Sequence, residues 1–152
     1  MEKKSKKYNT NALLLKGWFI PTASIFLQRS MLPTPFPKWY SEIYNGDYGL
    51  ELLLSTKGDF YYLNENMCVY RKNAINSLSL NGLKGTKFLK RKLFLLQQFK
   101  NNSENKNNSE NKNNIVINYI IIKVKLAILR VYLYEYFPFI VPLKDKIIKI
   151  YK

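Results

Sequence analysis

Residues 46–58 read GDYGLELLLSTKG, and this stretch sets the organisation of the sequence around it. Asp47 is a residue type that favours helix starts, and Gly58 is a typical C-terminal stop. Between them, three leucines fall on one face at helical spacing: Leu50, Leu53 and Leu54. We therefore predict a helix over about 47–57, with Asp47 at or near its N-cap.

The segments on both sides of this helix predict short strands and one long loop. Residues 22–28 follow Pro21 and contain an apolar run, which predicts a buried strand. Residues 30–46 hold three prolines and four aromatic residues, so we expect a loop of the long, aromatic kind that is often functional. After the helix, residues 59–63 and 67–71 predict two strands joined by a tight turn.

The C-terminal part of the chain predicts helices separated by a linker. Residues 84–99 form a basic amphipathic pattern, which suits either a membrane surface or a helix packed on the core with solvated lysines. The repeat SENKNN occurs twice in residues 103–114 and contains no apolar residue, which indicates a linker. Residues 115–137 alternate in part like a strand, but their length favours a helix.

Charge divides the chain unevenly. The net charge is +15, and residues 17–83 contribute nothing to it because they hold five basic and five acidic groups. Residues 1–16 contribute +4 and residues 84–152 contribute +11. Aromatic residues make up 15% and apolar residues 47%, which is enough to build a core. The expected regions are a basic N-terminal arm (1–16) that is solvated over residues 1–10, a neutral folded segment (17–83), a basic amphipathic helix (84–100), a low-complexity linker (101–114) and an apolar, basic helical tail (115–152).

Several kinds of chemistry are excluded by composition. The chain has no histidine and a single cysteine, Cys68, so it cannot hold a Ser-His-Asp triad, an internal disulfide framework or a cysteine zinc site. No Asp-x-Asp pair is present, and neither GxxxxGK[ST] nor GxGxxG occurs. The chain therefore lacks the sequence motifs with which proteins commonly hold a metal or cradle phosphates.

Three motifs nevertheless resemble one enzyme family in their order and spacing. Over about residues 17–75 the chain resembles the C-terminal half of bacterial family 2 glycosyltransferases, which have a GT-A fold. The motifs are FIPTAS at 19–24 followed by Arg29, Trp39 followed by GDYGL at 46–50, and ENMCVYR at 65–71. The resemblance implies an α/β fold, here an α+β fragment: a partial GT-A-like mixed sheet with flanking helices and a helical basic tail.

The resemblance also implies site residues. Asp47 would be the catalytic base that takes the proton from the acceptor hydroxyl; the alternative is a plain N-cap, and both roles can coexist. Thr22 and Ser24 would line the acceptor pocket, or their hydroxyls would bond to the backbone. Trp39 would stack on a sugar, or pack within its loop. Arg71 would face the diphosphate, or lie at the surface.

The chain lacks the part of the family that binds the nucleotide sugar. The family carries its nucleotide-sugar fold and Asp-x-Asp in an N-terminal half, and only sixteen residues precede Gly17, so we expect a truncated or split coding sequence. Asn73 also replaces a histidine common in the family. We expect no cofactor in this chain, although the family uses Mg²⁺ or Mn²⁺ with a nucleotide sugar. The chain alone is therefore expected to be inactive in the sugar transfer of polysaccharide assembly.

The implied partners are a nucleotide sugar, a glycan or lipid-linked acceptor, and a separate nucleotide-binding half. The alternative function is a non-catalytic basic module whose tails bind an anionic membrane surface or nucleic acid. Nucleic acid is disfavoured because the folded segment is neutral. No signal peptide or transmembrane helix is recognisable, so we expect a cytoplasmic location. The basic tails would also suit peripheral attachment to the inner face of the membrane.

Overall fold

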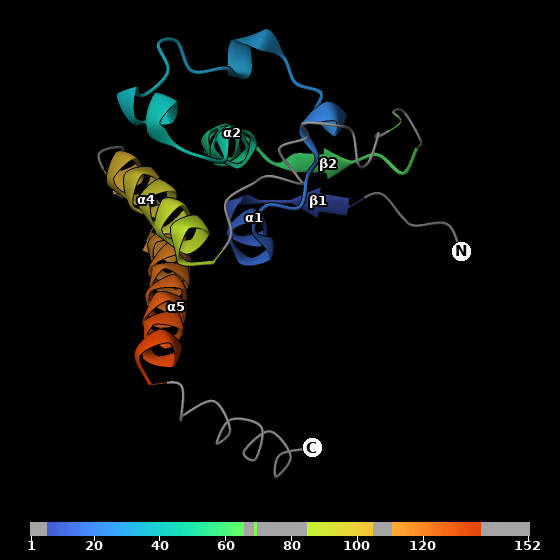
Figure 1. Cartoon of the computed structure of the whole chain (residues 1–152). Coiled ribbons are helices and arrows are strands. Elements are labelled where there is room, and N and C mark those ends of the chain that lie inside the picture. Colours follow the sequence, from blue (N-terminus) through green and yellow to red (C-terminus); the bar gives the residue numbers. More distant parts are fainter. Residues whose placement is uncertain (1–5, 66–68, 70–84, 105–110, 138–152) are drawn as a thin grey trace.

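A computed structural model describes residues 6–65, 69, 85–104 and 111–137. The described part is rich in helix and contains a two-stranded antiparallel sheet. Its main elements are β1 (Lys6–Tyr8), α1 (Thr10–Lys16), α2 (Gly46–Ser55), β2 (Phe60–Tyr62), α4 (Gly85–Glu104) and α5 (Asn111–Tyr136). In Figure 1, β1 and β2 lie side by side, and α4 and α5 form a second unit next to α1 and α2. The α+β class of the prediction is thus confirmed at this coarse level.

One apolar core joins the four α-helices that lie in the described part of the chain. Its buried members come from α1, α2, α4 and α5: Leu14, Tyr48, Leu52, Leu95, Leu96, Phe99, Ile117, Ile120, Ile121 and Val124. From α2 this core takes Tyr48 and Leu52; of the predicted leucine face, Leu53 and Leu54 are buried outside the cluster and Leu50 is half-buried. The isoleucines of α5 place an apolar face inward at helical spacing. Segments that are far apart in the sequence, including residues expected to form an N-terminal arm, therefore depend on each other for burial.

The first ten residues are not simply a solvated arm, because residues 6–10 are built into the structure. Lys6, Lys7 and Tyr8 pair with Tyr62, Tyr61 and Phe60. The next helix, α1, is capped at both ends: the Asn9 side chain accepts a hydrogen bond from the Ala12 backbone N–H at 3.0 Å. At the other end Gly17 has a φ of 71° and donates its N–H to the Leu13 carbonyl. These caps explain why so short a helix forms.

The predicted strand at 22–28 is wrong. Thr22–Ser24 is a single turn of 3₁₀ helix, closed by a bond from the Ser24 N–H to the Pro21 carbonyl. The apolar run that follows is not buried either, since Phe26 is 97% exposed. The strand partner predicted for β2, residues 67–71, lies outside the described residues except for Val69, which is in no strand. The antiparallel partner of β2 is instead β1.

The predicted helices form, with shifted bounds. The helix predicted at 47–57 is α2, and Asn45 rather than Asp47 stands at its N-cap position. The helix predicted at 84–99 is α4, and its leucine face packs on the core: Leu96 is fully buried. The predicted linker bounds, 101–114, are too wide, because α4 continues to Glu104 and α5 begins at Asn111. None of the helices in the described ranges is both long and apolar enough to cross a membrane.

The loop between the 3₁₀ turn Thr22–Ser24 and α2 is fixed to the helix by close packing. It contains two further short 3₁₀ helices, Arg29–Met31 and Lys38–Glu42. A Cβ atom at Gly49 would collide with Cδ1 of Ile43, so glycine in the middle of α2 leaves room for the loop. Tyr40 also donates a hydrogen bond from its hydroxyl to the Gly46 carbonyl at 2.9 Å. The aromatic loop is thereby held against the start of α2.

Candidate functional site

The start of α2 brings together two of the residues that the sequence predicts for one site. Thr22 Oγ1 donates a hydrogen bond to Asp47 Oδ2 at 3.0 Å, across 25 residues of sequence. The other oxygen of the same carboxylate, Oδ1, accepts a hydrogen bond from the Tyr48 backbone N–H at 2.9 Å. Each Asp47 oxygen thus has one fixed donor and retains a lone pair for a further hydroxyl group.

Asp47 is also favourably placed by its helix. It lies in the first turn of α2, where the unpaired N–H groups favour negative charge. Its side chain is partly exposed, so a ligand hydroxyl can reach it. A carboxylate fixed by two donors on a rigid element can accept a proton from, or hydrogen bond to, an alcohol.

The other predicted site residues are arranged differently. Ser24 Oγ donates to the Pro21 carbonyl at 2.7 Å, within its own turn, so its hydroxyl is used by the backbone. Trp39 lies in the aromatic loop with its ring centroid 6.2 Å from that of Tyr40, and its indole N–H is buried without a partner. Arg71 lies outside the described residues. Of the predicted set, the structure therefore joins Thr22 to Asp47.

Tyr40 is a neighbour of this site that the sequence did not single out. Its ring packs against Phe36 at a centroid distance of 4.8 Å. Burial, and to a lesser extent the negative charge of Asp47, raises the pKa of the Tyr40 hydroxyl. The only sequence signal was the aromatic composition of the loop, which does not say which ring approaches the carboxylate.

Glu51 is the second residue that sequence reasoning missed. It lies one helical turn after Asp47, its side chain is fully buried, and neither of its carboxyl oxygens has a hydrogen-bond partner. Burial, with a smaller contribution from the charge of Asp47, raises the pKa of Glu51 to about 8. The carboxyl is therefore protonated at neutral pH, and the two acids of α2 differ in charge.

The acids present here do not make a metal site. Within the described ranges, no three acidic or cysteine side chains gather closely enough to hold a cation. Asp47 is the one partly exposed carboxylate of α2, and Glu51 is enclosed and favours its neutral form. This donor set does not fit Mg²⁺ or Mn²⁺, which require several oxygen ligands, so we assign no metal-dependent step to it.

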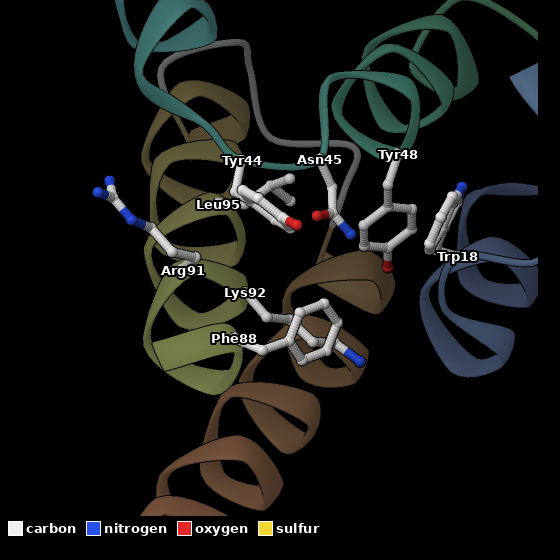
Figure 2. Close-up of a pocket in the computed structure, with 8 residues that line it drawn as sticks. All are labelled: Trp18, Tyr44, Asn45, Tyr48, Phe88, Arg91, Lys92 and Leu95. Atoms are coloured by element: carbon white, nitrogen blue, oxygen red, sulfur yellow. The ribbon is translucent and has the colours of Figure 1, made fainter. Parts of the chain in front are cut away.

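A small pocket lies between the start of α2, the helix α4 and Trp18 (Figure 2). It is lined by Trp18, Tyr44, Asn45, Tyr48, Phe88, Arg91, Lys92 and Leu95, and its volume is about 30 Å³. Burial lowers the pKa of the Lys92 ammonium group. Ligand pockets for whole cofactors measure hundreds of cubic ångströms, so this one is too small for a nucleotide sugar.

Searches with this chain against protein-family models, curated proteins and solved structures find no match.

Proposed function

We propose that this chain is the acceptor-binding part of a family 2-like glycosyltransferase used in polysaccharide assembly. The observation that carries the proposal is the hydrogen bond from Thr22 to Asp47. It joins the FIPTAS motif to the GDYGL motif, two of the three motifs on which the resemblance rests. The start of α2 then serves as the acceptor site, with the aromatic loop of Trp39 and Tyr40 beside it.

The proposed chemistry uses Asp47 as a general base. As the acceptor oxygen forms its bond to the anomeric carbon, its proton passes to an Asp47 carboxylate oxygen, and the nucleoside diphosphate leaves with the electron pair of the broken bond. Thr22 and the Tyr48 N–H hold the carboxylate in one orientation for this step. The nucleotide sugar is expected to be held by a separate nucleotide-binding half, since this sequence has no Asp-x-Asp motif.

Two binding experiments test the proposal. The chain is titrated calorimetrically with UDP-glucose, UDP-N-acetylglucosamine and GDP-mannose in the presence of Mn²⁺, and then screened on a panel of acceptor glycans. We expect no nucleotide-sugar binding or turnover, and binding of at least one glycan. Turnover by the chain alone would refute the separate-half part of the proposal.

The matched variants are Asp47→Asn and Glu135→Gln. Asp47→Asn keeps an oxygen that can accept one hydrogen bond but loses the charge, so glycan affinity should fall by about tenfold. Glu135 is exposed on α5, and its variant should bind as the wild type does. Equal affinity of Asp47→Asn and the wild type, with both folded by circular dichroism, would remove Asp47 from the acceptor site.

A further inference from the structure

Helix α5 has two opposite apolar faces, and the core covers only one of them. The inner face packs on the core through Ile117, Ile120, Ile121 and Val124. A second row of apolar and aromatic side chains follows steps of four and three residues along the helix. Each is between 41% and 75% exposed, and we call this row the outer stripe: Ile115, Tyr119, Ile122, Leu126, Leu129, Leu133 and Tyr136.

The spacing of the outer stripe makes it continuous. Residues three and four apart lie above one another on a helix, so the seven side chains form a single band. From Ile115 to Tyr136 the band is about 32 Å long at 1.5 Å per residue. Contiguous exposed apolar patches often mark interaction sites.

Basic side chains border the outer stripe on both sides. At 100° per residue, Lys123 and Arg130 flank one edge of the stripe and Lys125 flanks the other, and all three are exposed. Lys123 makes a cation–π contact with an aromatic ring of the same helix: its Nζ lies 4.7 Å from the ring centroid of Tyr119. Lys90 of α4 lies 5.3 Å from the ring centroid of Tyr132, which adds a further positive charge beside α5. The one acidic residue between 115 and 137 is Glu135.

This charge pattern distinguishes between occupants. Steps of four and three residues also suit a coiled coil with a second copy of the chain. In that assembly the flanking positions of the two helices would meet, and here they would bring lysines and arginine against one another. An anionic lipid surface has the complementary charge, and long basic side chains beside an apolar band can reach its headgroups while the band enters the interface.

We propose that the outer stripe of α5 docks the chain on an anionic membrane surface, with the helix lying in the plane of the interface. Ile122, Leu126 and Leu129 enter the acyl boundary, and the flanking cations bind lipid phosphates. This inference does not depend on the acceptor site, because α2 and the outer stripe share no residue.

Vesicle sedimentation of the full chain tests the proposal, with vesicles of phosphatidylcholine alone and with about a quarter phosphatidylglycerol. We expect binding to the anionic vesicles that weakens steeply with added salt. The double variant Leu126→Ser, Leu129→Ser should bind at least tenfold more weakly, since it removes two large apolar side chains. Lys123→Gln with Lys125→Gln should lose roughly fivefold for each charge.

The matched control is Lys38→Gln with Lys57→Gln, which removes the same charge from exposed positions away from α5 and should change affinity less than twofold. All substituted residues are exposed, and retained thermal unfolding confirms that each variant folds. Three results would overturn the proposal: equal binding to neutral vesicles, full affinity of the leucine variant, or a soluble dimer by light scattering that the leucine variant converts to a monomer while no vesicle binding is seen.

Discussion

Thr10 donates a hydrogen bond from its side-chain hydroxyl to the backbone carbonyl of Ser55 at 2.9 Å, and both residues are buried. This contact spans 45 residues and joins the first turn of α1 to the last turn of α2. The N-terminal segment is therefore fixed to the helix that carries Asp47, although the sequence suggested a free arm.

Thr10→Val tests the importance of this contact for stability. Valine keeps the shape of threonine but leaves the Ser55 carbonyl without that donor, so the free energy of unfolding should fall by about 1–2 kcal/mol. Thr10→Ser keeps the hydroxyl and should lose less. Denaturant unfolding followed by circular dichroism measures both, and a Thr10→Ser variant as unstable as Thr10→Val would mean that the methyl group matters as much as the hydrogen bond.

The contact between Thr22 and Asp47 can be measured by a double-mutant cycle. Thr22→Val and Asp47→Ala each remove one partner, and their coupling in unfolding free energy should be about 1 kcal/mol. Ser24→Ala offers the comparison, because Ser24 bonds to Pro21 and not to Asp47. If Ser24 couples to Asp47 as strongly as Thr22 does, the arrangement of the acceptor site described above is incorrect.

The buried carboxyl of Glu51 predicts that stability falls as pH rises. Its pKa is about 8 in the folded chain and about 4.5 in the unfolded chain, so between these values the folded state binds the extra proton. Raising the pH through this window therefore favours unfolding, by up to about 1.4 kcal/mol per pH unit. Tyr48 does not titrate in this window, because burial, with a smaller contribution from Glu51, raises the pKa of its hydroxyl above the ordinary value.

Glu51→Gln is the matched variant, since it has the same shape and no proton to lose. Unfolding of the wild type and the variant is measured from about pH 5 to about pH 8.5. The wild type should lose stability across this range and the variant much less. Parallel pH profiles for the two proteins would show that Glu51 has an ordinary pKa or becomes solvated in the folded state.

Helices α2, α4 and α5 were predictable because their signals are local, whereas α1 lies in residues expected to form an arm. The leucine spacing of α2 and the length of the apolar segment in α5 each define a helix without reference to the rest of the chain. β2 also lies within the strand predicted at 59–63, but its pairing with β1 was not predictable, because pairing is a long-range property. Lys6 and Lys7 carry no apolar alternation, yet they pair with β2, whereas the apolar run after Thr22 finds no sheet to join.

The candidate site shows the same division. Asp47 could be selected from its motif, and its helix start follows from the leucines beside it. Glu51 could not be selected from the sequence, because its burial depends on the packing of α2 against the other helices of the core. That packing involves residues far away in the sequence. The approach of Tyr40 to Asp47 likewise depends on how the proline-rich loop folds back on α2.

The two faces of α5 give the last prediction, a comparison of neighbouring isoleucines. Ile120 is 8% exposed within the core, whereas Ile122 is 56% exposed on the outer stripe. Ile120→Ala should lower the free energy of unfolding by about 2–5 kcal/mol, because it removes buried apolar surface and leaves a cavity. Ile122→Ala makes the same chemical change at an exposed site and should cost less than about 0.5 kcal/mol. Thermal and denaturant unfolding of both variants checks the difference. Similar losses for the two would contradict the orientation of α5 and, with it, the position of the outer stripe.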